Sequence, residues 1–350
     1  MSYYDENEKN NIIKLRDQLS SLPKFCKDYF RSIEPRTTSK TRLAYSYDLS
    51  VFFNFLKSSN PYFKDKDIEL DDLDKIGFQD IEEYMEYLKY YHDDTNTEMS
   101  NSVFGIKRKV ASLRSFYKYY YNNGLIKTNP ASRVTLPKLR DKEIIRLDVN
   151  EVADLIDSVE SGDKLTTHEQ QFHNKTKLRD TALLSLLLGT GMRVSECIGI
   201  NISDIDLKNT AIRIKRKGAK EATIYFSDEV LKSLTDYLNY RNTIKNVTEK
   251  DSDALFLSLQ KKRMTARSVQ KLVKKYASRI TPLKHITPHK LRSTFGTNLY
   301  QETDDIYLVA SVLGHNDVNT TKKHYAAMED NQKRLARNVV KLRDNDEKKD

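Results

Sequence analysis

The scarcity of glycine and proline is the feature that most limits which folds this chain can adopt. Only 10 glycines and 7 prolines occur in 350 residues, about 5% of the chain against about 12% in average proteins. Sandwiches and barrels of short strands need frequent turns, and these two residue types form many of them. With 38% hydrophobic and 31% charged residues, the composition predicts a mainly α-helical globular protein.

Length and apolar patterning narrow the class further. A chain of 350 residues corresponds to about two domains. The longest apolar stretch, Ala182 to Gly189, is far shorter than the ~18 residues of a membrane span. The polar, acidic N-terminus does not resemble a signal peptide, and Cys26 and Cys197 can form at most one disulfide. We therefore expect a soluble, cytoplasmic protein with no membrane partner.

The net charge of +10 is distributed unevenly along the chain. Residues 65–94 hold twelve acidic residues and three lysines, whereas residues 105–147 hold eleven basic residues and two acidic ones. Segregated positive charge favours a polyanionic partner such as nucleic acid. Charge alone is equally compatible with a solvated helix surface.

Apolar residues at three- and four-residue spacing predict helices in the first half. One begins at Ser39, with Thr38 and Ser39 as cap candidates, and another spans about Phe78 to Tyr91. A third carries the clearest apolar stripe, formed by Val103, Ile106, Val110, Leu113, Phe116, Tyr117 and Tyr120. Its basic residues lie largely off that stripe, at Lys107, Arg108, Arg114 and Lys118. This basic face would enter a DNA groove or simply face water.

The segment from Asn129 to Glu143 has neither helical nor strand periodicity. It holds two prolines and several basic residues, Lys138 and Arg140 among them. We interpret it as part of an extended interdomain linker, residues 129–147, which could lie along a phosphate backbone.

The second half predicts helices around one β-hairpin. Residues Ala211 to Phe226 alternate apolar and polar on both sides of Lys217 and Gly218, which indicates a hairpin with its turn there. We expect no other β structure. After a polar loop from Ser161 to Lys175, helices are predicted at 178–188, 227–241, 265–280, 290–301, 304–313, 318–328 and 331–342, following one near 149.

Five short segments contain residues suited to chemistry on a phosphodiester. They are GTGMRVSE with Arg193, RKGAK with Lys217, TPHKLR with His289 and Arg292, LGH with His315, and KKHYAAM with Tyr325. Each alone has a structural explanation, such as a surface ion pair, a solvated hairpin residue or a packed ring. Together they fit one reaction, because two arginines can neutralise the non-bridging oxygens of a phosphodiester.

The remaining members of the set supply the other roles of that reaction. A tyrosine hydroxyl, with a reference pKa of ~10, needs a base or a positive site to act as a nucleophile. His289 could act as the base, Lys217 as the general acid and His315 as a hydrogen-bond donor to the phosphate. No carboxylate cluster suited to Mg²⁺ is recognisable, so a two-metal nuclease is disfavoured. We expect no metal and no cofactor.

The order and the residue sequences of these segments resemble the motifs of the tyrosine recombinases, and within that family those of the bacterial Xer group. GTGMRVSECIGINISDIDLKNTAIRIKRKGAKE resembles the first family box and its hairpin, and TPHKLRSTFGTNLY with VLGHNDVNTTKKHY resembles the second. The resemblance is strong from Val149 to Met328 and weaker in the first half. Residues Gln18 to Leu56 are similar to the single-recombinase Xer enzymes of streptococci.

This resemblance assigns roles to particular residues. It implies a catalytic set of Arg193, Lys217, His289, Arg292 and His315, with Tyr325 as nucleophile and Glu196 as a supporting ion-pair partner. It also implies a two-domain DNA clamp. The expected parts are an N-terminal extension (1–20), a SAM-like helical core-binding domain (21–128), the linker (129–147), a mixed helical catalytic domain (148–328), and a C-terminal helix and tail (329–350). Arg267 and Lys271 join Lys138 and Arg140 as candidate DNA contacts.

Two positions depart from the family pattern. Ser293 follows Arg292, where many members carry a histidine. Ten positions separate His315 from Tyr325, one more than is common in Xer proteins, so the chain must shift by one residue to present this tyrosine.

The implied function is site-specific DNA recombination through a 3′-phosphotyrosyl intermediate and a Holliday junction. The implied partners are a dif-like double-stranded site, a homotetramer on two sites and a DNA translocase, in chromosome dimer resolution. Alternatives left open are a mobile-element integrase, a type IB topoisomerase and a catalytically silent DNA-binding clamp. The C-terminal helix would dock onto a neighbouring protomer or pack onto its own chain.

Overall fold

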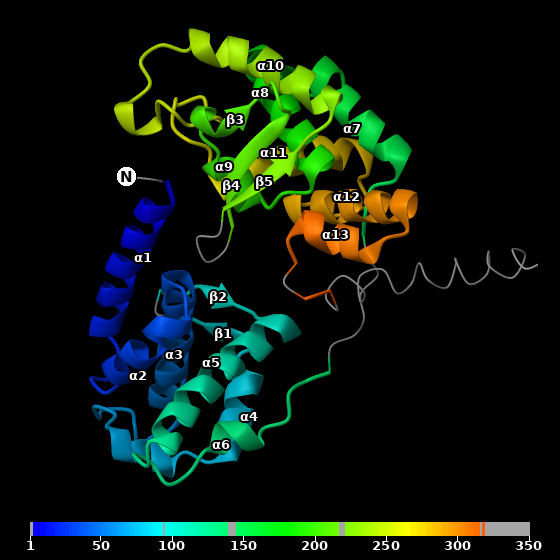
Figure 1. The fold of residues 1–350 in the computed structure, drawn as a ribbon. Helices are drawn as coiled ribbons and strands as arrows, with labels where there is room; N and C mark the ends of the chain where they lie inside the picture. The colour runs from blue at the N-terminus through cyan, green and yellow to red at the C-terminus, as the bar shows by residue number, and fades with distance from the viewer. Residues whose placement is uncertain (1–2, 94, 139–144, 217–220, 316, 319–350) are drawn as a thin grey trace, which may run out of the picture. The chain divides into compact units, whose positions relative to one another are not determined.

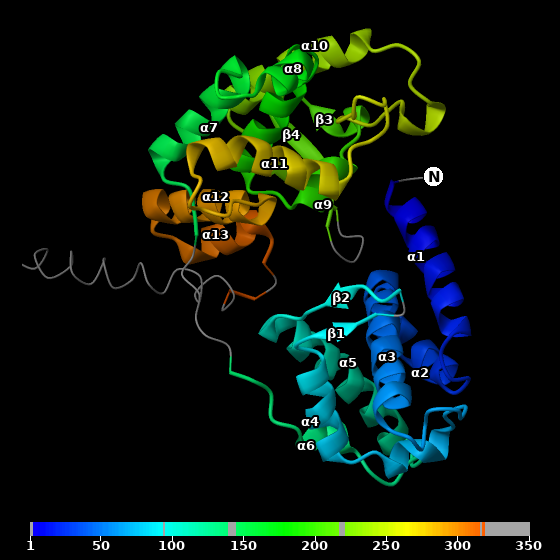
Figure 2. The same cartoon turned by 180° about the vertical axis from the view of Figure 1, so that it is seen from behind.

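The computed structural model describes residues 3–318, apart from 94, 139–144, 217–220 and 316. The chain divides into two compact units, Met1–Lys142 and Glu143–Asp350 (Figures 1 and 2). Helices dominate both units, which confirms the predicted fold class. Within the described ranges, every helix is too short or too polar to cross a bilayer.

The first unit is built on two long helices, α3 (Ser39–Ser59) and α5 (Val103–Asn122). Apolar side chains from these and from neighbouring helices share one core rich in aromatic rings, with Phe52, Tyr84 and Phe116 almost completely buried. Thr38 caps α3 as predicted, since its hydroxyl accepts from the Thr41 N–H at 3.2 Å. The remaining elements are α1 (Tyr3–Ser20), α2 (Cys26–Ile33), η1 (Glu34–Arg36), η2 (Leu70–Lys75), α4 (Phe78–Tyr87), β1 (Tyr91–His92), β2 (Glu98–Met99) and α6 (Pro130–Arg133).

Two details of the predicted helices in this unit are wrong. α4 ends at Tyr87, and the residues beyond it form β1, which pairs antiparallel with β2. The Asp93 carboxylate accepts the N–H groups of Thr95 and Thr97 at 2.9 Å, which stabilises a turn in place of another helical turn. The side chain of Val103 is exposed, so the buried stripe of α5 begins at Ile106.

The segment from Tyr3 to Ser20 is a helix of this unit. α1 packs along α3 and buries Leu15. The Ser39 hydroxyl also donates to the Glu8 carboxylate at 2.6 Å. What the sequence presented as a short extension is therefore a helix of the first unit.

The start of the expected linker also belongs to the first unit. Pro130–Arg133 form α6 rather than extended chain, and Ala131 and Val134 are buried in the first core. Arg114 of α5 donates to the carbonyl of Ala131 at 3.0 Å and to that of Val134 at 2.6 Å. These bonds give Arg114 a structural role in joining α5 to α6, and its predicted DNA contact stays a prediction.

A buried carboxylate in the first unit provides a stability prediction. Asp48 is 1% exposed and is paired with the ammonium group of Lys109, itself 7% exposed, at 3.1 Å, and with Arg108. Asp48→Ala leaves the buried Lys109 charge uncompensated and is expected to lower the free energy of unfolding by about 3–5 kcal/mol. Chemical denaturation measures this change in the free energy of unfolding. Asp28→Ala, which breaks the exposed pair with Arg31, is the control and should have little effect.

The second unit surrounds the long apolar helix α8 (Thr167–Thr190). α7, α10 and α12 all pack on α8, and Leu183, Leu184, Leu186 and Leu187 are fully buried. α8 begins earlier than predicted, within the supposed polar loop, because Thr166 and Glu169 form a capping box there. The other helices are α7 (Val149–Ser161), α9 (Val194–Gly199), η3 (Ile202–Asp204), α10 (Asp228–Thr243), η4 (Glu249–Asp251), α11 (Ala266–Ile280), α12 (Pro288–Thr303) and α13 (Ile306–Leu313).

The predicted β-hairpin is present as part of a slightly larger sheet. β4 (Ala211–Lys215) pairs antiparallel with β5 (Glu221–Tyr225), which confirms the two strands. The turn residues 217–220 lie outside the described residues. A short strand, β3 (Ile205–Asp206), pairs with the other edge of β4, so the expectation of a single hairpin as the whole β content is wrong.

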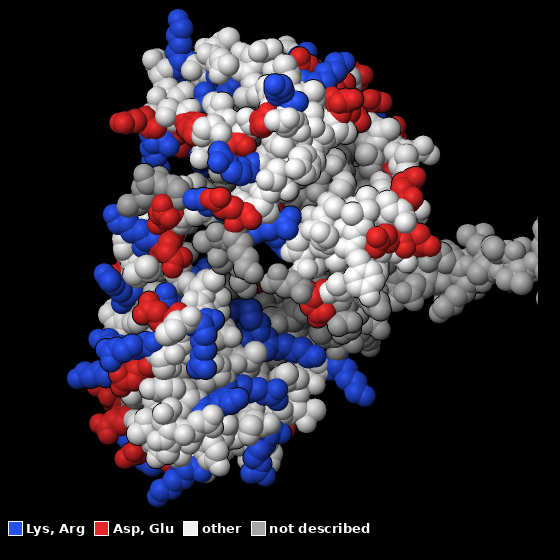
Figure 3. All heavy atoms as spheres, viewed as in Figure 1, with Lys and Arg blue, Asp and Glu red and all other residues white. Residues whose placement is uncertain are grey.

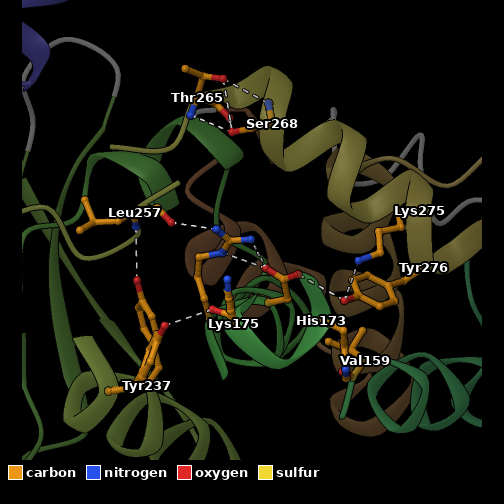
Figure 4. Close-up of polar contacts among 12 residues, drawn as sticks. Val159, His173, Lys175, Tyr237, Leu257, Thr265, Ser268, Lys275 and Tyr276 are labelled. Atoms are coloured by element: carbon orange, nitrogen blue, oxygen red, sulfur yellow. Dashed lines mark hydrogen bonds and ion pairs between the residues drawn. The ribbon is translucent and has the colours of Figure 1, made fainter. Parts of the chain in front are cut away.

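A buried polar network ties α8 to its neighbours (Figure 4). The Asp180 carboxylate accepts from Arg179 and, at 3.2 Å, from the Tyr276 hydroxyl of α11. Arg179 also donates to the carbonyl of Leu257. The backbone N–H of Leu257 in turn donates to the Tyr237 hydroxyl of α10. These bonds connect the middle of α8 to α11 and, through Leu257, to α10.

Candidate active site

Arg193 lies directly after the C-terminus of α8. Gly191 ends that helix with φ +60°, and a side chain there would collide with Phe295, since an added Cβ would lie 2.4 Å from its ring. Arg193 then caps α9, where its N–H and guanidinium both bond to the buried Glu196 carboxylate, at 2.7 and 2.8 Å. The same guanidinium also donates a hydrogen bond to the Gly314 carbonyl at 3.2 Å.

Arg292, which lies on α12, also binds the backbone at the end of α13. It is only 5% exposed, and its guanidinium donates to the Gly191 carbonyl at 2.7 Å and to the Leu313 carbonyl at the end of α13. Arg193 and Arg292 therefore bind two consecutive carbonyl groups. The C-terminus of a helix carries partial negative charge, which favours cations there.

His289 lies close to Arg292 in the chain, and His315 directly follows the carbonyl groups that both arginines bind. His289 is exposed and lies on the first turn of α12, three residues before Arg292, so both project from one face of that helix. The Ser293 hydroxyl donates to the His289 carbonyl at 3.1 Å, and this is the role of the serine that departs from the family pattern. His315 follows Gly314, and its N–H donates to the Ala310 carbonyl at 2.9 Å.

The structure thus brings Arg193, Arg292 and the backbone of His315 to the end of α13. Two guanidinium groups that bind consecutive carbonyls bring positive charge to this turn, part of which the Glu196 carboxylate offsets. Guanidinium groups suit an anion with several oxygens. Lys217 and Tyr325 lie outside the described residues, as does Arg140.

The predicted DNA contacts divide into two groups. Lys118, Lys138, Arg267 and Lys271 have exposed side chains, and Arg267 and Lys271 are four residues apart on α11. Lys107 is half-buried, Arg108 is paired with Asp48, and Arg114 is bonded internally. Figure 3 shows Lys and Arg side chains spread over the visible face of the first unit. As DNA contacts, all of these residues stay predictions.

The sequence patterns did not predict the partners of two basic residues. Lys109 is the buried partner of Asp48, and Arg216 donates to the Val312 carbonyl at 3.1 Å. Both stand in runs of basic residues, where spacing alone does not separate a buried cation from a solvated one. Among the described residues, no group of three His, Cys, Asp or Glu side chains is placed to hold a metal ion.

Two family descriptions match nearly the whole chain. Residues 139–332 match the phage integrase family, and residues 21–136 match the phage integrase SAM-like domain. A tyrosine recombinase XerC of Caldanaerobacter subterraneus is 35% identical over 320 residues, covering 89% of this chain and 84% of that protein. XerC of Thermodesulfovibrio yellowstonii is 33% identical, covering 81% of this chain and 85% of that protein.

Solved structures share the fold. XerH recombinase bound to a palindromic difH substrate has a TM-score of 0.65 at 20% identity, covering 94% of this chain and 88% of that one. The Tn1549 transposon integrase in complex with a circular intermediate DNA has a TM-score of 0.61 at 18% identity, covering 89% and 99%. The chain belongs to the phage integrase family. Within that family it is a site-specific tyrosine recombinase.

Proposed function

We propose that Tyr325 is the nucleophile with which this recombinase cuts DNA. The Tyr325 oxygen forms a bond to the scissile phosphorus as the bond from phosphorus to the 5′ oxygen breaks. The products are a 3′-phosphotyrosyl link and a 5′ hydroxyl. A 5′ hydroxyl of a partner duplex then attacks the link, which restores the tyrosine and gives a Holliday junction. Each step exchanges one phosphate ester for another, so no external energy source is needed.

The residues assigned to the site suit the charge changes of this reaction. Arg193 and Arg292 stabilise the negative charge that spreads over the non-bridging oxygens in the transition state. His289 accepts the phenolic proton, Lys217 protonates the departing 5′ oxygen, and His315 donates a hydrogen bond to the phosphate. Glu196 holds Arg193 through the ion pair at 2.8 Å. The observation that supports this proposal most is that Arg193 and Arg292 bind adjacent carbonyls immediately before His315.

A nicked suicide substrate tests the proposal. Cleavage close to a nick releases a short fragment that diffuses away, so the covalent protein–DNA species accumulates and is visible on a denaturing gel. The wild-type protein should form this species on DNA that holds its site. Relaxation of supercoiled plasmids without any specific site would instead indicate topoisomerase activity, and binding without an adduct would indicate a silent DNA-binding protein.

The similarity to the XerC proteins supports a chromosomal role. We propose that the target is a dif-like site, that four protomers assemble on two such sites, that a DNA translocase assists, and that the reaction resolves chromosome dimers. A plasmid carrying two direct copies of a candidate site reports this as deletion of the intervening DNA. Recombination only at the ends of a mobile element would contradict the chromosomal role and identify an integrase.

Cleavage is expected to be unaffected by EDTA. The positive charge at the phosphate is assigned to Arg193, Arg292 and Lys217, and chelators do not remove side-chain charges. Adduct formation is measured on the suicide substrate with and without EDTA at constant ionic strength, because DNA binding depends on salt. Loss of the adduct on chelation, with recovery on adding Mg²⁺, would contradict these assignments.

A further inference from the structure

Three arginines from three different elements bind three consecutive carbonyl groups at the end of α13. Arg216 donates to Val312 at 3.1 Å, Arg292 donates to Leu313, and Arg193 donates to Gly314 at 3.2 Å. The last two belong to the proposed catalytic set. Arg216 does not, although it holds the same turn of the backbone.

Arg216 lies against the residue that precedes His315. It directly follows β4 and is half-buried. A Cβ added to Gly314 would lie 2.1 Å from one terminal nitrogen of Arg216 and 2.4 Å from its Cζ. Gly314 also has φ +63°, a conformation that favours glycine. The guanidinium therefore fills the space that a side chain at position 314 would need.

The guanidinium of Arg216 is partly enclosed by the protein. Its Nε is buried without a hydrogen-bond partner among the described residues. A buried donor without an acceptor is unfavourable, whereas a surface arginine would turn this group toward water. Packing and the bond to Val312 keep the guanidinium in place.

We propose that Arg216 is a positioning residue for His315, because it fixes the end of α13 against the β4 end of the hairpin. His315 is the residue that follows this turn, and its N–H donates to the Ala310 carbonyl. Loss of the Val312 contact releases one of three fixed points of the turn, and with it the orientation of the imidazole. This inference rests on the proposed function, in which His315 donates to the phosphate.

Three variants separate this role from plain DNA binding. Arg216→Met keeps the aliphatic stem but removes the donor, and Arg216→Lys keeps one charged donor. Arg213→Ala removes an exposed positive charge from β4, the strand that precedes Arg216. Arg216→Met should slow single-turnover cleavage at saturating protein by about tenfold to a hundredfold, the effect of one hydrogen bond from a charged donor. Lysine should restore part of that rate, and Arg213→Ala should leave it unchanged. DNA affinity should fall equally for Arg216→Met and Arg213→Ala.

A double-mutant cycle with His315→Ala tests whether Arg216 acts through His315. If it does, Arg216→Met should slow cleavage strongly in the wild-type background and by less than about twofold once His315 is absent. A purely structural role would give the same slowing in both backgrounds and would overturn the inference. So would a change confined to DNA affinity.

The inference and the proposed function fail in different ways. If the wild-type protein forms no covalent adduct, the proposed function fails. If the wild-type protein forms the adduct and Arg216→Met forms it at the same rate, only the role of Arg216 fails. If the Met variant does not fold, the same cycle with Arg216→Lys decides between the two outcomes, because lysine lacks the planar guanidinium.

Discussion

Tyr325→Phe should abolish the covalent protein–DNA adduct while leaving DNA affinity unchanged. Phenylalanine keeps the ring and removes only the oxygen that would form the phosphotyrosyl bond. Without that oxygen the first step cannot occur, so we expect the cleavage rate to fall by at least about a thousandfold. A denaturing gel measures the adduct, and fluorescence anisotropy with labelled duplex measures the affinity.

Tyr62→Phe is the matched control for this prediction. Tyr62 is exposed, and its hydroxyl accepts hydrogen bonds from Lys75 and, at 3.1 Å, from Lys66. These bonds lower the pKa of Tyr62 below its usual range, so it is a chemically plausible rival nucleophile. We expect Tyr62→Phe to form the adduct at the wild-type rate. An adduct that persists in Tyr325→Phe and disappears in Tyr62→Phe would reassign the nucleophile.

The buried tyrosines are poor rivals because their phenols are removed from solvent and DNA. Burial raises the pKa of Tyr117 and of Tyr276 well above the usual range. In Tyr276 the neighbouring Asp180 carboxylate adds to the effect, since it repels a phenolate and accepts a hydrogen bond from the neutral hydroxyl. These side chains fill the cores, as helical spacing predicts for many of the chain's 21 tyrosines.

The parts of the fold that sequence predicted well are those dominated by one periodic pattern. The helix from Ser39 and the strands on either side of Lys217 agree with the structure because apolar spacing and caps indicate the same element. α1, α6 and the β1–β2 pair were missed. Their residues are mostly polar or few in number, and they are held by tertiary contacts such as the bonds of Arg114, which local spacing does not encode.

The candidate site could be predicted as a set of residues but not as an arrangement. The motifs indicated Arg193, Arg292 and His315, and gave Glu196 as an ion-pair partner. They could not indicate that both arginines bind the backbone at the end of α13, because carbonyl acceptors carry no side-chain signal. The contact of Arg216 could not be predicted for the same reason, since its partner is also a main-chain carbonyl.

The general acid is tested by a substrate whose leaving group needs no proton. Lys217→Ala should slow cleavage of ordinary DNA by about a hundredfold to ten-thousandfold, the usual contribution of a positioned acid. A 5′-bridging sulfur at the scissile phosphate leaves as a thiolate, which has a much lower pKa than an alkoxide. Protonation then becomes unnecessary, so this substrate should bring Lys217→Ala to within about tenfold of the wild-type rate.

Arg292→Ala should behave differently on the same sulfur substrate. Arg292 is assigned to the charge on the non-bridging oxygens, and that charge develops whichever atom leaves, so the variant should stay impaired. Lys215→Ala is the control within the hairpin, because Lys215 is an exposed residue of the same basic run and should cleave both substrates normally. Single-turnover rates on the two substrates give the comparison, with thermal unfolding confirming that Arg292→Ala is folded. Equal rescue of Lys217→Ala and Arg292→Ala, or of neither, would remove Lys217 from the role of acid, and selective rescue of Lys215→Ala would transfer that role to it.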